Sequence, residues 1–144
     1  MEKEDSKVKV KKIIENKIDG ENEKSNLFYT IPNCIIDNNG VFKYIQIRLK
    51  NLDSKEERII IRGWKDLEYH RQNFIRFKIK ETTGLLNCNF KSIGGGRISI
   101  DSDRKKIFVY GYSKSYGRCD HSMTCQILKL NFKNFECTWS NEGY

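Results

Sequence analysis

The stretch GVFKYIQIRL, residues 40–49, decides the fold because its side chains alternate in character. Alternation is the pattern of a β-strand with one face against a core, and the strand follows a turn-forming Asn-Asn-Gly sequence. The odd-numbered residues from Val41 to Leu49 would share the apolar face. Lys43 is the exception on that face. A lysine there either points into a polar pocket at the end of the sheet or extends past the sheet into solvent.

Further strands and two helices are predicted on either side of this stretch. Strand character recurs at residues 27–37, 57–64, 97–100, 105–112 and 135–140. Residues 65–81 predict a helix with Asp66 near its start, and residues 120–130 predict a second helix capped by Asp120. The three glycines at 94–96 predict a sharp turn. Together these elements predict a single α+β domain, with two helices packed on a mixed sheet of about six strands.

The length and charge of the chain set its broad class. It has 144 residues, which suits one domain, and a formal net charge of +8. Residues 1–24 contain equal numbers of lysine and acidic residues, so the excess positive charge lies in residues 25–144. We expect 1–24 to be a charged, flexible extension, with a short amphipathic helix as the alternative, and 25–144 to be the folded domain. A cationic domain attracts nucleic acid, phosphorylated protein or small phosphates, and charge alone does not choose among them.

Several classes are excluded by what the sequence lacks. No apolar run approaches the ~20 residues of a membrane span, and the first residues contain no apolar signal segment. We therefore expect a cytoplasmic protein with no membrane partner. The five cysteines include no CxxC pair and there are only two histidines, which does not suit a zinc site. We expect reduced thiols and neither a metal nor a cofactor.

His70 is the candidate for catalysis. On a helix over residues 65–81, its side chain falls within the apolar stripe of Leu67, Phe74 and Phe77 and so faces the sheet. A histidine titrates near neutral pH and is the usual general base. The alternative is a buried histidine hydrogen-bonded to a backbone carbonyl, and periodicity alone favours this structural role.

The glycine run and the arginine after it are a candidate anion site. Residues 94–96 would let backbone approach a ligand closely, and Arg97 would add a guanidinium that binds phosphate with two hydrogen bonds. The alternative is a tight connection with no ligand.

A second candidate is the connection YSKSYG at residues 112–117. Its exposed N–H groups, beside the start of a helix, could bind an anion. The binding residues would be Ser113, Lys114 and Ser115. Tyr112 and His121 are candidates for the edge of the pocket. An ordinary loop is an equally good interpretation of this segment.

Familiar phosphatase motifs are missing from the sequence. No cysteine is followed by five residues and an arginine, as the thiolate-nucleophile phosphatases require. Residues 101–103, Asp-Ser-Asp, follow a strand as an aspartate-nucleophile motif would, but Lys105 stands where those enzymes have Thr or Val. We interpret this segment as a turn. No set of carboxylates and histidines suggests a two-metal site, so any phosphoryl chemistry would be metal-free.

Six segments, taken in order, resemble a known family. They are GVFKYIQIRL, RGWKDLEYH, GGGRIS, KKIFVYGYSKSYG, the histidine in CDHS and the terminal TWSNEGY. Together they resemble the protein histidine phosphatase family, the small phosphohistidine phosphatases also called Janus/Ocnus proteins. The resemblance extends from about Leu27 to Tyr144. Any single segment is weak evidence, and their order makes the match specific.

The resemblance implies an α+β enzyme that removes phosphate from phosphohistidine-containing proteins without a metal. It implies that His70 of the EYH motif is the catalytic proton acceptor and that Lys43 binds substrate. It also implies that Arg97 lines the site and that the loop backbone holds the phosphate at Ser113, Lys114 and Ser115. The family usually has Ala where Ser115 stands. Residues 81–93 depart most, because the cysteine cluster of the family is reduced there to Cys88.

Other interpretations stay open at this stage. A non-catalytic module could bind phosphorylated proteins with the same basic residues, but it would not need His70. A nucleic-acid-binding domain would interleave basic residues with surface aromatics, whereas the aromatics here alternate along strands as core residues do. His70 could also accept the phosphoryl group transiently instead of acting as a base. We expect a monomer that does not bind nucleic acid.

Overall fold

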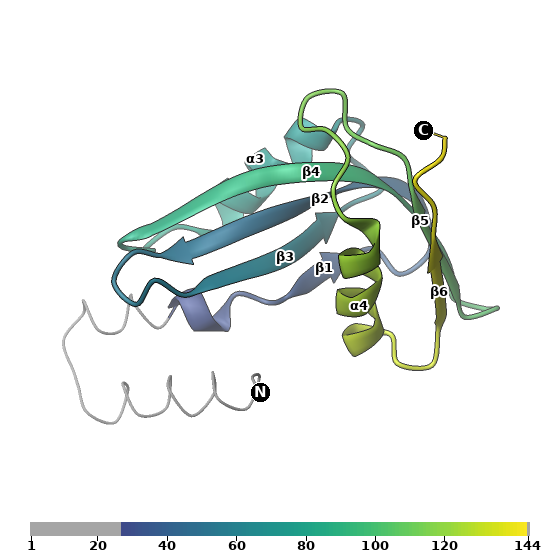
Figure 1. Cartoon of the computed structure of the whole chain (residues 1–144), viewed down its shortest axis with the longest axis horizontal. Coiled ribbons are helices and arrows are strands. Elements are labelled where there is room, and N and C mark those ends of the chain that lie inside the picture. The colour runs from purple at the N-terminus through teal and green to yellow at the C-terminus, as the bar shows by residue number, and fades with distance from the viewer. Residues whose placement is uncertain (1–26, 144) are drawn as a thin grey trace.

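The fold is built on one sheet with a helix on each face. The computed structural model describes residues 27–143. The elements in chain order are β1 (Cys34–Ile36), β2 (Gly40–Asn51), β3 (Glu57–Gly63), α3 (His70–Glu81), β4 (Cys88–Asp101), β5 (Lys106–Tyr110), α4 (His121–Asn131) and β6 (Glu136–Trp139). The strands form a six-stranded sheet in the order β1-β3-β2-β4-β5-β6 (Figure 1). The β1–β3 and β5–β6 pairs are parallel and the other pairs antiparallel, which confirms the predicted mixed sheet and α+β class.

The alternation along β2 divides the core between the two faces. The odd-numbered Ile45, Ile47 and Leu49 are buried in the cluster that includes Phe77 of α3. The even-numbered Phe42 and Tyr44 are buried in the other cluster, against α4. In Figure 1, α4 lies in front of the sheet and α3 behind it. Side chains of a strand point alternately to its two faces, so one strand supplies both cores.

The first predicted strand, expected within residues 27–37, is confirmed as a short edge strand, but it is confined to the end of that range. Residues 27–30 are helical, and only Cys34–Ile36 form a strand, at the edge of the sheet. Pro32 precedes this short strand, as expected of a residue that cannot donate to a ladder. The predicted extension, residues 1–24, lies outside the described residues.

The predicted helix at 65–81 begins five residues late, at His70. Tyr69 is extended, with φ −120° and ψ 148°, and the side chain of Gln72 accepts hydrogen bonds from the N–H groups of Glu68 and Tyr69 at 2.9 Å. This side-chain acceptor fixes the chain in a non-helical entry to α3. Asp66 does not cap the helix and instead pairs with Arg76 at 2.6 Å.

The glycine run is not a turn. Gly94, Gly95 and Gly96 lie inside β4, where they pair with Gln46, Ile45 and Tyr44 of β2. The turn lies further on, at Asp101, whose side chain accepts the N–H of Arg104 at 3.1 Å.

The second predicted helix is confirmed. The Asp120 side chain caps α4 by accepting the N–H groups of Ser122 and Met123. Within residues 27–143, no helix is long and apolar enough to cross a membrane.

Candidate active site

His70 lies at the first position of α3, packed directly onto the glycine run of β4. It is 5% exposed, and its Nε2 lies 2.8 Å from the carbonyl oxygen of Gly96. A Cβ on Gly95 would lie 2.7 Å from Cδ2 of His70. The imidazole can approach the sheet this closely because residue 95 has no side chain.

The Gly96 hydrogen bond determines which nitrogen of His70 is available. A carbonyl only accepts, so Nε2 carries the hydrogen and Nδ1 holds the lone pair in the neutral ring. Among the described residues, Nδ1 has no hydrogen-bond partner. Burial, which has the largest effect, lowers the pKa of His70, and Lys43 and Arg97 lower it further, against the opposing effect of the Gly96 bond. The ring is therefore neutral near pH 7, with a nitrogen able to take a proton.

Lys43 and Arg97 are brought together by strand register. They are direct partners in the β2–β4 ladder, so they lie on the same face of the sheet, the face that carries α3. The Lys43 ammonium also lies 5.4 Å from the centroid of the Tyr69 ring. Two cations separated by more than fifty residues in sequence thus lie beside His70.

The loop after β5 is fixed against β4 by backbone hydrogen bonds. Ser113 and Gly117 exchange N–H···O bonds of 3.1 and 2.7 Å, and Gly95 donates to the carbonyl of Gly117 at 2.9 Å. The Ser113 hydroxyl accepts the N–H of Tyr116 at 3.0 Å. The N–H group of Lys114 donates to no other described residue, and neither does that of Ser115. Two adjacent donors are thus free for a ligand on a rigid loop.

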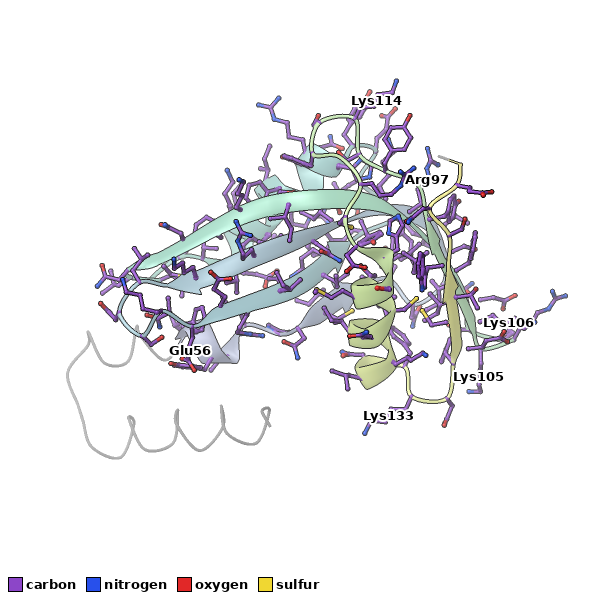
Figure 2. The ribbon with its side chains drawn as sticks, viewed as in Figure 1. Glu56, Arg97, Lys105, Lys106, Lys114 and Lys133 are labelled. Carbon is purple, nitrogen blue, oxygen red and sulfur yellow. The ribbon has the colours of Figure 1, made fainter. Side chains whose placement is uncertain are left out.

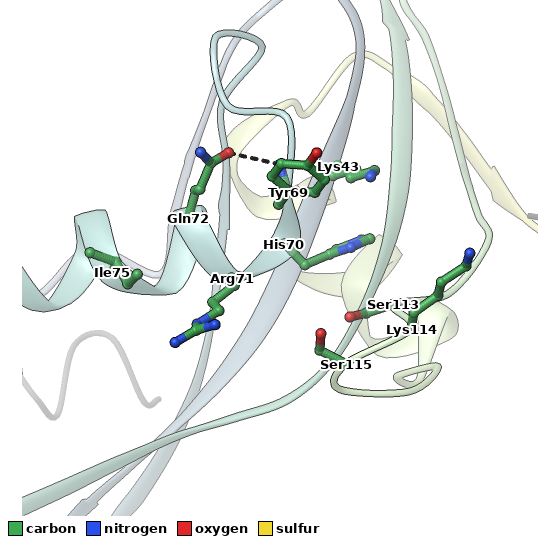
Figure 3. Close-up of a pocket in the computed structure, with 9 residues that line it drawn as sticks. All are labelled: Lys43, Tyr69, His70, Arg71, Gln72, Ile75, Ser113, Lys114 and Ser115. Carbon is green, nitrogen blue, oxygen red and sulfur yellow. Dashed lines mark hydrogen bonds between the residues drawn. The ribbon is translucent and has the colours of Figure 1, made fainter.

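These elements surround a pocket of about 620 Å³ (Figure 3). The nine residues that line it are Lys43, Tyr69, His70, Arg71, Gln72, Ile75, Ser113, Lys114 and Ser115. None is acidic, and the first turn of α3 contains no acidic residue either. Figure 3 shows the His70 ring between Lys43 and the loop. A pocket with basic side chains, free N–H groups and a helix N-terminus suits an anion with several oxygens, such as phosphate.

Five of the predicted site residues line this pocket, namely Lys43, His70, Ser113, Lys114 and Ser115. Four lining residues were missed by sequence reasoning. They are Tyr69, Arg71, Gln72 and Ile75. Their nearness to His70 in the sequence could have identified them, because they lie just before it or in the first turns of the helix that it begins.

Two residues predicted for the pocket edge and one predicted substrate contact lie elsewhere. Arg97 pairs with Lys43 of β2 and with Tyr110, the last residue of β5, but it is not among the residues that line the pocket (Figure 2). Tyr112 packs against the guanidinium of Arg118, 5.5 Å from its ring centroid. His121 is 1% exposed on the α4 face of the sheet and does not line the pocket. It was misplaced because the start of α4 follows the loop in sequence while its side chain points to the opposite side of β4.

A metal site was not predicted. Within the described part of the chain, residues 27–143, no group of three or more His, Cys, Asp or Glu side chains is arranged to hold a metal ion.

Comparison with known proteins shows which family this chain belongs to. The sequence model of the Janus/Ocnus family matches residues 28–136, which include every predicted site residue. The human 14 kDa phosphohistidine phosphatase is 40% identical over 119 residues, covering 79% of this chain and 94% of the human protein. The pig protein of the same name is 38% identical, with 79% and 93% coverage. The sex-regulated protein janus-A of Drosophila pseudoobscura pseudoobscura is 36% identical, with 79% and 78% coverage. The chain therefore belongs to the Janus/Ocnus family.

Proposed function

We propose that this protein is a phosphohistidine phosphatase, which hydrolyses phosphohistidine in other proteins without a metal ion. Two mammalian relatives that match most of the chain bear this name. The observation that carries the proposal is the Nδ1 of His70. It is a neutral, unbonded acceptor in a pocket that has basic side chains and no acidic one.

The pocket's own donors would bind the phosphoryl group. Its oxygens would accept hydrogen bonds from the Lys43 ammonium and from the N–H groups of Lys114 and Ser115, with Arg97 adding positive charge beside Lys43. Fixed donors of this kind stabilise the charge that a phosphoryl group carries in its transition state. They supply the stabilisation that a metal ion provides in other phosphatases.

His70 would activate the water that attacks phosphorus. As the water oxygen bonds to phosphorus, Nδ1 of His70 takes a water proton. The P–N bond breaks, its electron pair stays on the substrate imidazole, and that nitrogen takes a proton from solvent, to which His70 later returns the proton it accepted. In the alternative route, Nδ1 attacks phosphorus itself and water then hydrolyses the phosphorylated His70. Both routes require the neutral ring with an open Nδ1.

The test is phosphate release from a protein phosphorylated on histidine, in the presence of EDTA. We expect release at an undiminished rate when EDTA is added. Loss of the activity on chelation and its return with a divalent ion would contradict metal-free hydrolysis. Binding of the phosphorylated protein without release of phosphate would instead identify a binding module.

Gel filtration would test whether the protein is a monomer, as we expect. Cell fractionation would test whether it is located in the cytoplasm, as we also expect.

A further inference from the structure

Helix α4 lies beside the edge strand β6 (Figure 1). Cys125 lies in α4 and Cys137 in β6. Their sulfur atoms lie 2.7 Å apart. A covalent disulfide requires about 2.05 Å, so a small movement would bring the two sulfurs to bonding distance. Both side chains belong to the cluster that packs α4 onto the sheet, which holds them in this arrangement.

The other three cysteines have different surroundings. Cys34 and Cys119 are buried, as Cys125 is, but among the described residues neither hydrogen-bonds to another thiol, and burial raises their thiol pKa values to about 12 and about 11. Cys119 also contacts the Tyr44 hydroxyl at 3.1 Å. Cys88 is the first residue of β4. All five cysteines fall within the described residues, and only Cys125 and Cys137 hydrogen-bond to each other.

The hydrogen bond between the two thiols makes them chemically unequal. Cys137 donates its S–H to the sulfur of Cys125, and this lowers the pKa of the Cys125 thiol. The pKa of Cys137 is raised, because losing its proton would break that bond and because it is partly buried. Cys125 is thus the first to become a thiolate, the nucleophilic form. Cys125 is buried and Cys137 is only half-buried, so a small oxidant can reach the pair from the Cys137 side.

We propose that Cys125 and Cys137 are an oxidation site, which a peroxide converts into a disulfide joining α4 to β6. The Cys125 sulfur attacks the O–O bond of hydrogen peroxide, giving a sulfenic acid and one water. The Cys137 sulfur then attacks the Cys125 sulfur, the S–O bond breaks, and the hydroxide takes the Cys137 proton to leave as a second water. Two thiols lose two electrons and one peroxide becomes two waters.

The test uses the full-length reduced protein, treated with hydrogen peroxide and then with N-ethylmaleimide under denaturing conditions. We expect peroxide-treated protein to carry two fewer maleimides than untreated protein, and peptide mapping to find Cys125 linked to Cys137. The disulfide should raise the melting temperature by on the order of 5–10 °C, because it closes a short loop without distorting the fold. Dithiothreitol should reverse both changes.

Cys137→Ser and Cys88→Ser are the matched variants. Cys137→Ser should form no such link, whereas Cys88→Ser should form it as the wild type does. Full alkylation after peroxide, a link through a different cysteine, or sulfinic acid at Cys125 would overturn the proposal. A Cys125–Cys137 link that lowers the melting temperature would also overturn it, because the two sulfurs would then not be prearranged for bonding. Wild-type mapping decides the question even if Cys137→Ser does not fold.

Discussion

The two histidines of this protein pack against opposite faces of strand β4, and they differ in the hydrogen bonding of their Nδ1 atoms. Each is buried at the first position of a helix, and each donates from Nε2 to a backbone carbonyl at 2.8 Å, Gly96 for His70 and Gly111 for His121. Burial lowers the pKa of both. The Nδ1 of His121, however, accepts the Tyr44 hydroxyl at 2.6 Å, while the Nδ1 of His70, a residue that lines the pocket, has no hydrogen-bond partner among the described residues. The second nitrogen distinguishes a structural histidine from a candidate base.

The α4 side is a closed hydrogen-bond network. The Tyr44 hydroxyl contacts His121, Thr124 and Cys119, and Gln46 donates to Thr124 at 2.8 Å. Burial keeps the Tyr44 pKa well above its usual value, so the hydroxyl stays protonated and can donate. A fully satisfied network of this kind holds parts rigid and leaves no group free to react.

Replacing each histidine by asparagine should reveal the largest difference in activity between the α3 face and the α4 face of the sheet. His70→Asn keeps a polar side chain but removes the base, so phosphohistidine hydrolysis should fall by about 10²- to 10⁴-fold in a folded protein. His121→Asn should lower the melting temperature, because Tyr44 or Gly111 loses a buried partner at a cost of about 1–3 kcal/mol. Its activity per folded molecule should fall far less. Equal losses of activity in the two folded variants would erase the proposed difference.

Alanine at Gly95 and Gly96 should disturb one histidine each. A Cβ at residue 95 would lie 2.6 Å from the carbonyl oxygen of Tyr44 and 2.7 Å from the ring of His70. A Cβ at residue 96 would lie 2.4 Å from the carbonyl oxygen of Tyr110 and 2.5 Å from Cε1 of His121. Gly95→Ala should therefore displace the base and lower kcat, by about 10²-fold if the shift approaches 1 Å. Both variants should lower stability, measured by thermal unfolding, because each Cβ also meets a backbone carbonyl, and Gly95→Ala should show the larger loss of kcat per folded molecule. The opposite pattern would mean that the two faces have been assigned wrongly.

Removing one positive charge beside His70 should slow hydrolysis, but by less than removing His70 itself. Lys43→Ala and Arg97→Ala should each slow hydrolysis by about ten- to a hundredfold, since one charged contact contributes about 1.5–3 kcal/mol. Lys106→Ala is the matched control, because Lys106 is exposed at the other end of β5 from Arg97 and Lys114 (Figure 2). Steady-state kinetics with a phosphohistidine peptide would measure all three. Unchanged kinetics in both Lys43→Ala and Arg97→Ala would place the phosphate elsewhere.

The pH dependence should show the smallest effect. The His70 pKa is lowered from 6.5, so its ring stays neutral, and the rate stays above half-maximal, down to a pH below 6.5. Because both histidines have lowered pKa values, the unfolded chain takes up protons first, so stability is full above about pH 6.5 and declines as pH falls. Initial rates measured across this pH range, corrected for spontaneous hydrolysis, would test the prediction about the rate. A half-maximal rate above pH 6.5 would indicate a different titrating group.

The sequence predicts the α3 side better than the α4 side. Strand alternation places Lys43 correctly, and helical periodicity turns His70 toward the sheet even though the helix starts later than predicted. The glycines at 94–96 could not be placed, because their role is to admit side chains from distant segments. The position of His121 and the meeting of Cys125 with Cys137 depend on how α4 packs. Local patterns in sequence do not encode such contacts.

Nitrogen NMR of the protein labelled with ¹⁵N-histidine tests the central claim most directly. Near pH 7.5 both rings should be neutral with the hydrogen on Nε2. Inorganic phosphate should then shift the Nδ1 resonance of His70 and leave that of His121 unchanged, because only His70 lines the pocket and the Nδ1 of His121 is bonded to Tyr44. A His70 ring with its hydrogen on Nδ1, or a phosphate response confined to His121, would contradict the account.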